Sequence, residues 1–397
     1  MRKNKVKISK LISKIDNVYE YNWDYIWSIP EFNILKSCQQ STVWHQEGNV
    51  DVHTKLTCEH ALTFANDPSF PSEDAELLLL AALFHDIGKG VTTKQGKDGR
   101  WHSYNHELMS ERITRRLLWD EGREIREKIC SLVRWHMAPM SIFERKDYIG
   151  GIVALSEKVP SLRLLLILKR CDLEGSIMDL KEKNIDRIKL SDIEKIAENL
   201  NCLNEQPNIT HRLYRHQAFA EFANKKEVNV YMIIGLPGSG KDTFINNVLI
   251  SDERCVKYVD DEPIRLVNPK NACVLCRDDI RAELGLCKPG EKIVSSSKNE
   301  ELVSQLFNKR MLDAAKHGKD IIINNINLKS EYRKEYIRQL SNYALNVIYI
   351  YIETDSLDIN LERRNGQVDL SVYNSMIEKF DWPDKSEYDS IHYIKGN

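Results

Sequence analysis

The sequence predicts a two-domain protein with an all-α N-terminal half and an α/β C-terminal half built on a parallel sheet. Two observations support this prediction. Apolar residues recur at spacings of three and four through the first 200 residues, whereas short β-branched runs alternate with helical patterns after residue 225. The length of 397 residues fits two domains of about 100–200 residues each.

The N-terminal half is expected to form one domain over residues 1–215. Three segments have clear helical periodicity: 73–89, 110–136 and 160–175. The stretches around 90–105 and 137–150 lack this period and are rich in glycine and polar residues, which predicts loops. Strand signals are nearly absent, so we expect a helical bundle.

The C-terminal half is expected to form the second domain over residues 226–397. Its first strand is EVNVYMIIG at 227–235, and further apolar runs follow at 319–325 and 345–353. Continuously apolar strands separated by helical patterns are typical of a parallel sheet covered on both faces. The domain boundary is expected between about residues 205 and 226, where the sequence includes a polar stretch.

Bulk composition limits the possible classes of function. The formal net charge is −2, so no global basic field draws the chain to nucleic acid, and any such contact must be local. The odd count of nine cysteines in a chain this long favours reduced thiols and a cytoplasmic location. The longest apolar stretch, residues 77–84, is too short to cross a bilayer, and the basic N-terminus lacks a signal-peptide core. We therefore expect a soluble protein with no membrane partner.

Histidines and acids form the first group of candidate site residues. Seven of the eleven histidines lie between His45 and His136. Imidazole nitrogens and carboxylate oxygens are ligands for divalent Mn, Fe, Co, Ni or Zn. Each candidate lies near the end of a predicted helix, so one bundle can direct all of them inward. The residues of this group are His53, His85, Asp86, His102, His106, His136 and Asp172.

This set resembles the HD phosphohydrolase superfamily, whose ligand order is H…HD…D, with two further histidines in two-metal members. The segment HQEGNVDVHT also looks like the start of the HD module of some bacterial tRNA nucleotidyltransferases. By this resemblance, the first metal would be held by His53, His85, Asp86 and Asp172. Asp86 would bridge to a second metal on His106 and His136, and Lys89 would meet the phosphate. A domain that keeps its metal without catalysis remains an alternative. His45, His60 and His102 are either substrate contacts or ordinary surface and structural residues.

The run VYMIIGLPGSGKDTF resembles a Walker A P-loop between a strand and a helix. Small residues let backbone N–H groups wrap a phosphate, while the lysine neutralises charge towards the γ-phosphate. The position after the lysine departs from the pattern, because an aspartate stands where Ser or Thr is usual, with a threonine next; this aspartate is a possible magnesium holder. The expected nucleotide contacts are Gly235, Gly238, Ser239, Gly240, Lys241, Asp242 and Thr243.

Downstream segments resemble phage-type 5′-OH polynucleotide kinases. In VLCRDDIRAELG, the resemblance makes Asp278 the general base on the acceptor hydroxyl and Arg281 the contact for the neighbouring phosphate. Asn325 stands where these kinases carry an acid that orients that arginine. Arg363 and Arg364 would belong to a lid over the triphosphate. The alternatives are that Asp278 caps a helix and that the two lid arginines lie on a solvated face.

The two halves together resemble bacterial HD-Pnk end-healing enzymes over nearly the whole chain. This resemblance implies ATP or another NTP and Mg²⁺ in the C-terminal domain, transition metals in the N-terminal domain, and RNA or DNA ends as partners. It implies removal of 2′,3′-cyclic, 2′- or 3′-phosphate, phosphorylation of 5′-OH ends, and a functional partnership with a nucleic-acid ligase. Two alternatives remain: an HD nucleotidase fused to a nucleoside or metabolite kinase, and a sensing module without turnover.

Overall fold

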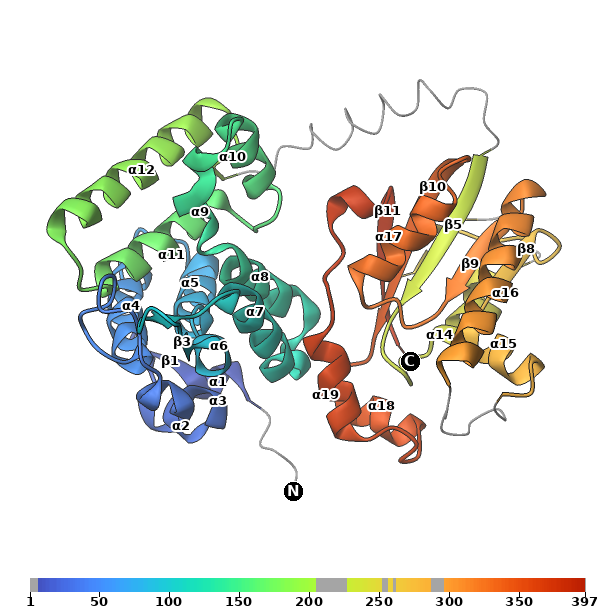
Figure 1. The fold of residues 1–397 in the computed structure, drawn as a ribbon, viewed down its shortest axis with the longest axis horizontal. Helices are drawn as coiled ribbons and strands as arrows, with labels where there is room; N and C mark the ends of the chain where they lie inside the picture. The colour runs from blue at the N-terminus through green and yellow to red at the C-terminus, as the bar shows by residue number, and fades with distance from the viewer. Residues whose placement is uncertain (1–5, 205–226, 252–255, 260–261, 287–295, 397) are drawn as a thin grey trace. The chain divides into compact units, whose positions relative to one another are not determined.

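The computed structural model describes residues 6–204, 227–251, 256–259, 262–286 and 296–396. The chain divides into two compact units, residues 1–210 and 211–397, which are described separately here (Figure 1). The predicted boundary at 205–226 lies outside the described residues. Among the described helices, none is both long and apolar enough to cross a membrane.

The N-terminal unit is helical, as predicted. Its elements are α1 (Ile8–Leu11), β1 (Ile12–Ile15), β2 (Val18–Tyr21), α2 (Trp23–Ser28), α3 (Pro30–Asn33), η1 (Ile34–Ser37), α4 (Val50–Ala65), α5 (Ser72–Phe84), α6 (Lys89–Thr92), β3 (Lys94–Gln95), β4 (Trp101–His102), α7 (His106–Leu117), η2 (Trp119–Glu121), α8 (Arg123–Trp135), α9 (Ala138–Ser141), η3 (Ile142–Glu144), α10 (Tyr148–Ser156), α11 (Leu162–Gly175) and α12 (Leu180–Asn199).

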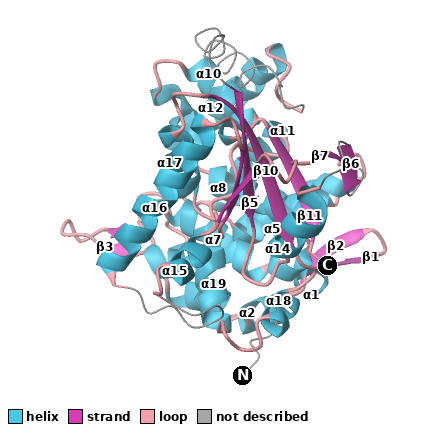
Figure 2. Cartoon of the chain, turned by 90° about the vertical axis from the view of Figure 1, so that its right-hand side faces the viewer, coloured by secondary structure: helices cyan, strands magenta, loops and turns pink. Residues whose placement is uncertain are grey.

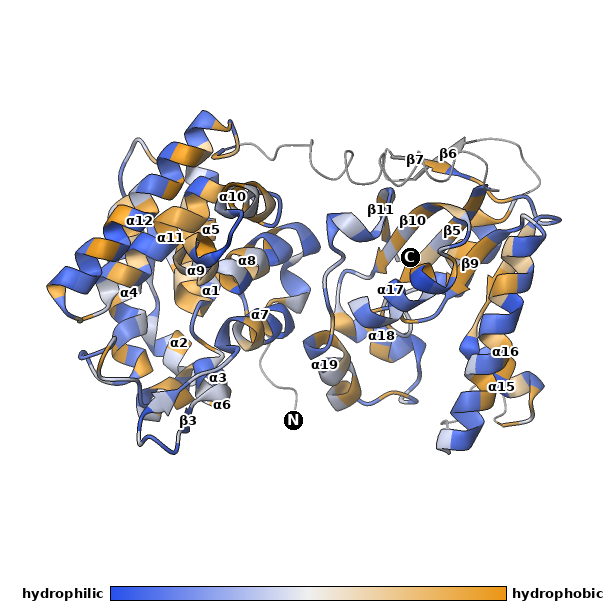
Figure 3. Cartoon of the chain, turned by 45° about the horizontal axis from the view of Figure 1, so that its top comes forward, coloured by the Kyte–Doolittle hydropathy of each residue, from blue (hydrophilic) through white to orange (hydrophobic). Residues whose placement is uncertain are grey.

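Helix α5 forms the centre of this unit. Every residue from Leu77 to Phe84 is buried, and α5 contacts α4, α8 and α11. A helix that is apolar on all sides is stable only inside a core. In the hydropathy colouring of Figure 3, apolar residues are seen on α5 and its neighbours. This central position places the C-terminal end of α5, which is followed directly by two of the predicted metal ligands, inside the bundle.

Three local features differ from the sequence predictions. Two small antiparallel hairpins, β1–β2 and β3–β4, lie in the half expected to be free of strands. The first turns at Asp16 and Asn17, which both have positive φ, a conformation that Asp and Asn tolerate. The segment 110–136 is not one helix, because Gly122 has φ +88° and separates η2 from α8. The expected loop at 137–150 contains α9 and η3.

The C-terminal unit is an α/β domain, as predicted. Its elements are β5 (Glu227–Ile234), α14 (Lys241–Phe244), η4 (Ile245–Leu249), β6 (Val256–Val259), β7 (Glu262–Arg265), β8 (Ala272–Leu275), α15 (Arg277–Glu283), α16 (Ser297–Lys316), β9 (Asp320–Asn324), α17 (Ser330–Gln339), β10 (Ala344–Glu353), α18 (Leu357–Arg363), α19 (Leu370–Glu378), η5 (Lys385–Glu387) and β11 (Ser390–Lys395).

The sheet of this unit has five strands in the order β11-β10-β5-β9-β8 (Figure 1), and every neighbouring pair is parallel. Strands β5, β10 and β11 are also seen in Figure 2. The alternate residues Tyr231 and Ile233 of β5 pack with Phe244 and Ile245 of the following helical segment. Because the strands are parallel, the segments that follow β5, β8 and β9 meet at one edge of the sheet. All the residues predicted to take part in the chemistry of this unit, except the lid arginines, lie in the segments along that edge.

A buried arginine connects the segments behind that edge. Arg333 on α17 is fully buried and its Nε donates to Glu387 Oε2 at 2.8 Å. Its Nη1 donates to the carbonyls of Asn327 and Leu328 at 3.0 and 2.9 Å, and its Nη2 to that of Asp381 at 2.9 Å. One guanidinium therefore holds the loop after β9 against the segment before β11.

We expect Arg333→Met to destabilise the C-terminal unit by about 3–5 kcal/mol, because it removes the buried partner of Glu387 and leaves only the exposed Lys334, 4.0 Å away, to offset that buried charge. Urea unfolding followed by circular dichroism measures the change. Arg338→Met, on the same helix, is the matched control, since the pair of Arg338 with Glu335 is exposed and should contribute little. Equal unfolding midpoints for the two variants would contradict this role for Arg333.

Candidate functional sites

Ends of helices bring the six predicted metal ligands together. His53 lies in the first turn of α4, and His85 caps the C-terminal end of α5 with Asp86 next in the chain. His106 begins α7, and His136 caps the C-terminal end of α8. The sixth ligand, Asp172, lies on α11. Five of the six are buried in the N-terminal unit, and His106 is half-buried.

Asp86 is the centre of this group. Its Oδ2 lies 3.2 Å from His85 Nε2 and 3.5 Å from His53 Nε2. Its Oδ1 lies 3.2 Å from His106 Nε2 and 3.9 Å from His136 Nε2. The two oxygens of one carboxylate thus serve two different pairs of imidazoles. This is the arrangement expected of a carboxylate shared between two metal ions.

Asp172 completes the first set of ligands. Its Oδ1 is 3.0 Å from His53 Nε2 and 3.8 Å from His85 Nε2. Its Oδ2 accepts a hydrogen bond of 2.7 Å from Lys169 Nζ, a residue that the sequence did not single out. Burial alone would raise the pKa of Asp172, but the Lys169 charge and the His53 hydrogen bond hold it well below its usual range. Asp172 is therefore ionised, as a metal ligand would have to be.

Backbone carbonyls set the orientation of three of the imidazoles. The Nδ1 atoms of His85, His106 and His136 lie 2.7–2.9 Å from the carbonyl oxygens of Ala82, Ser103 and Val133. A carbonyl only accepts, so each Nδ1 carries the proton and each Nε2 directs a lone pair to the centre. The buried Asp86 Oδ1 lacks a hydrogen bond of good geometry. Donor set, tautomer and unsatisfied oxygen all fit a pair of divalent metals.

Lys89 and His45 lie at the edge of this centre. Lys89 Nζ contacts Asp86 Oδ2 at 2.7 Å and donates to Gln40 Oε1 at 2.9 Å. Glu47 Oε1 lies 2.8 Å from His45 Nδ1 and 3.1 Å from His53 Nδ1. Glu47 therefore accepts a hydrogen bond from His45 and lies against His53, whose Nδ1 lacks a hydrogen bond of good geometry. Gln40 and Glu47 were missed in the sequence, although Glu47 lies within the quoted HQEGNVDVHT segment.

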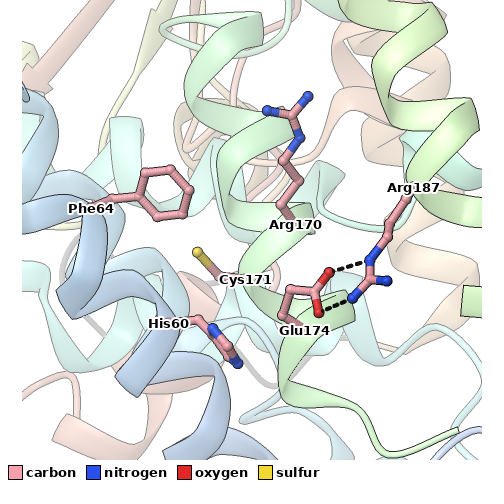
Figure 4. A pocket seen from close by; sticks show the side chains of 6 residues that line it. All are labelled: His60, Phe64, Arg170, Cys171, Glu174 and Arg187. Carbon is pink, nitrogen blue, oxygen red and sulfur yellow. Dashed lines mark hydrogen bonds and ion pairs between the residues drawn. The ribbon is translucent and has the colours of Figure 1, made fainter. Parts of the chain in front are cut away.

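The two weaker histidine candidates lie elsewhere. His102 pairs with Asp98 at 3.1 Å on the exposed β3–β4 hairpin. His60 lines a pocket whose other residues are Phe64, Arg170, Cys171, Glu174 and Arg187 (Figure 4). Both arginines of this pocket are already engaged, Arg187 with Glu174 and Arg170 with Glu194. This pocket contains none of the six predicted metal ligands. Neither His60 in the pocket nor His102 on the hairpin therefore lies among those ligands.

The predicted P-loop joins β5 to α14 in the second unit. Gly238 and Gly240 have φ of +77° and +94°, and a Cβ at Gly235 would lie 2.6 Å from the Ile352 carbonyl oxygen. Lys241 Nζ donates to the carbonyls of Gly235 and Leu236 at 3.0 and 2.9 Å. Burial lowers the pKa of Lys241 to about 8, against the opposing charge of Asp242. The lysine is therefore held inside a tightly wound loop.

Residues after β10 support this loop. Asn360 Nδ2 and the Tyr373 hydroxyl both donate to the Pro237 carbonyl at 2.9 Å. Arg363 Nη1 donates to the Gly238 carbonyl at 3.2 Å. Arg364 is near enough for its charge to contribute to the lowered pKa of Lys241, after burial. The structure thus brings both predicted lid arginines to the P-loop, and adds Asn360 and Tyr373 as supports that the sequence did not indicate.

The acceptor-side residues lie on α15, which follows β8. The Asp278 side chain is 69% exposed, and its Oδ1 accepts from Arg281 Nη1 at 2.5 Å. Glu300 on α16 holds Arg281 with two bonds of 2.8 Å, to Nε and Nη2. Glu300 also accepts from Arg277 Nη2 at 3.2 Å. One carboxylate therefore orients two neighbouring guanidinium groups.

Asn325 has a different place from the one expected for it. Its Oδ1 accepts from the backbone N–H of Arg277 at 3.1 Å, and its Nδ2 donates to the Tyr336 hydroxyl at 3.4 Å. The partners of Arg281 are Glu300 and Asp278 instead. The physical reason is that an amide at the end of β9 satisfies the first turn of α15, while the charged partner comes from α16. Sequence spacing does not indicate that helix contact.

Comparisons with known proteins agree with both sites. Residues 50–173 match the family described as HD domain, and residues 230–383 match the family described as AAA domain. Two curated proteins named Multifunctional CCA protein, from Actinobacillus pleuropneumoniae serotypes 5b (strain L20) and 7 (strain AP76), are each 39% identical over 88 residues. The match covers 22% of this chain and 20% of each relative. The chain thus joins an HD domain to a P-loop kinase-like domain, and spans about a fifth of those relatives' length.

Proposed function

We propose that the chain repairs broken nucleic-acid ends. The HD domain removes a 2′,3′-cyclic, 2′- or 3′-phosphate from the 3′ end, and the P-loop domain transfers the γ-phosphate of ATP or another NTP to a 5′-OH of RNA or DNA. The observation that carries the proposal is that one chain combines a histidine and carboxylate cluster around Asp86 with a P-loop whose lysine is close enough to feel the charge of Asp278, the partner of Arg281. Cleavage of RNA through the 2′-OH leaves both kinds of blocked end.

The residues of the HD site have separable roles in phosphate removal. Divalent metals held by the six ligands would supply a water of lowered pKa and a clamp for phosphoryl oxygens. Lys89, a buried cation beside Asp86, is placed to neutralise charge on the departing phosphate. Glu47 places a negative charge beside His53 Nδ1. The experiment described below compares Mn, Fe, Co, Ni and Zn as the metals of this site.

The residues of the P-loop site have roles in phosphoryl transfer. The loop amides and Lys241 bind the triphosphate, while Arg363 and Arg364 add positive charge beside the loop. Asp278 accepts the proton of the attacking 5′-OH, and Arg281 binds the adjacent phosphate of the acceptor. The exposed Asp278 favours a polymer end over a metabolite in a closed pocket. Because the products carry 5′-phosphate and 3′-OH ends, a nucleic-acid ligase is the expected functional partner.

The test is a short RNA with a 5′-OH and a 2′,3′-cyclic phosphate, incubated with ATP, Mg²⁺ and each transition metal in turn. We expect both ends to change, as read by mass spectrometry. The same reactions with a matched DNA and with free nucleosides compare the classes of acceptor. Phosphorylation of nucleosides alone, with the RNA unchanged at both ends, would replace the proposal by an HD nucleotidase fused to a small-molecule kinase.

Glu300→Gln is expected to raise the KM for the 5′-OH acceptor at least roughly tenfold, with the KM for ATP unchanged. Its neutral amide gives up charge-assisted bonds to Arg281, each worth about 1.5–3 kcal/mol. Steady-state kinetics with varied RNA and varied ATP measure the split. Glu301→Gln is the control, because this neighbour is exposed and its carboxylate accepts a hydrogen bond of 3.4 Å from Gln305 on the same helix. An equal loss towards both substrates would instead indicate a general structural role.

A further inference from the structure

The aspartate that follows the P-loop lysine has a built environment. Asp242 Oδ1 accepts a hydrogen bond of 2.6 Å from Asn324 Nδ2. Asn324 is the last residue of β9, which pairs directly with β5, so it lies beside the loop that begins where β5 ends. The usual hydroxyl residue at this position would be neutral. This chain instead places a fixed negative charge next to Lys241.

Two oxygen atoms, one on the bonded Asn324 and one on Ser239 of the P-loop, are buried and lack hydrogen-bond partners. Asn324 is 8% exposed and its Oδ1 has no hydrogen-bond partner. Ser239, within the loop, is 1% exposed and its Oγ also has none. Buried polar atoms without partners are costly, so each such atom requires an explanation. A carboxylate, an amide oxygen and a hydroxyl are together the ligands that hard divalent cations prefer.

More negative charge surrounds the same position. The pKa of Asp279 on α15 is raised, first by burial and then by the charges of Asp242 and Asp278. Three carboxylates therefore lie close enough to influence one another beside a single P-loop. Without a cation this group repels the phosphates of an incoming nucleotide, and with a cation the repulsion becomes attraction.

We propose that Asp242, Asn324 and Ser239 form a divalent cation site that is loaded before the nucleotide. The P-loop then binds Mg²⁺ or Mn²⁺ in the absence of NTP, and it binds NTP only weakly without the metal. This inference rests on one part of the proposed function, namely that the P-loop binds a nucleoside triphosphate. The carboxylate supplies the charge that holds the metal, and Asn324 fixes its orientation.

The first experiment counts Mn²⁺ ions on the nucleotide-free, full-length protein from the electron paramagnetic resonance signal of free Mn²⁺. We expect Asp242→Ser to bind one ion fewer per chain than the parent, with the ions of the HD centre retained. Asp242→Asn keeps the shape of the side chain and should lose the same ion. Asp313→Asn, an exposed change on α16, is the control and should bind as the parent does. An unchanged count in Asp242→Ser and Asp242→Asn would overturn the proposal.

The second experiment measures the affinity for ATP, which we expect the variant to gain when no metal is present. In EDTA, Asp242→Ser should bind ATP roughly tenfold more tightly than the parent, because a repelling charge is gone. With Mg²⁺ present, the gain in affinity that the metal gives should be smaller in the variant than in the parent. Equal ATP binding in EDTA would overturn the proposal. A parent that binds Mn²⁺ but no ATP with Mg²⁺ would instead overturn the proposed kinase activity, so the two failures are distinguishable.

Discussion

Replacing Lys241 by alanine is expected to lower 5′ phosphorylation by at least about 10³-fold and to leave phosphate removal from the 3′ end unchanged. Lys241 is the one basic residue between Gly235 and Asp242, and its Nζ donates to the carbonyls of Gly235 and Leu236. Charge neutralisation at the transferring phosphoryl group supplies most of the catalysis in this reaction class, and several kcal/mol correspond to this factor. Both activities are measured on one RNA that carries both blocked ends.

Two companion variants sharpen this expectation. Asp278→Ala should also abolish phosphorylation while leaving ATP affinity close to that of the parent, because a general base acts on the acceptor and not on the donor. Lys316→Ala, an exposed change at the end of α16, should leave both activities intact. If Lys241→Ala removed phosphate removal as well, in a chain that stays folded, the assignment of two separate sites would be wrong.

The sequence was most informative where the chemistry is local. The P-loop could be predicted because a strand, a glycine-rich turn and a lysine follow one another within about fifteen residues. The six predicted metal ligands are far apart in the chain, and it was the resemblance to the HD ligand order that selected them from the histidines and acids near helix ends. The fold class followed from the helical and strand patterns of the two halves. The short hairpins did not, since strands of two to four residues carry almost no periodic signal.

The residues that the sequence missed act across elements. Glu300 reaches Arg281 from another helix, and Asn324 reaches Asp242 on α14 from strand β9. Such partners are set by tertiary packing, and a single sequence gives no measure of which charged residues meet. Asn325 shows the opposite error. Its position in the motif predicted a contact with Arg281, but it accepts a hydrogen bond from the backbone N–H of Arg277. The carboxylate that orients Arg281 comes from α16 instead.

His85→Ala combined with Asp86→Ala is expected to give the opposite result to Lys241→Ala. Phosphate removal should fall by at least roughly 10³-fold, while 5′ phosphorylation is retained. Asp86 directs one oxygen to each pair of imidazoles, so its loss removes a ligand from both proposed metal positions at once. Metal content, measured by mass spectrometry of the purified chain, should fall with the activity. Mg²⁺-dependent ATP binding should not change.

The chain provides a matched control for this double variant. His102 and Asp98 form another histidine–aspartate pair, 3.1 Å apart, on the exposed β3–β4 hairpin. Removing both should leave metal content and both activities at the level of the parent. If this control lost as much phosphate removal as the variant at Asp86, the loss would reflect disturbance of the unit and not of its centre. If the variant at Asp86 kept its metals and its activity, the ligand set around that carboxylate would be refuted.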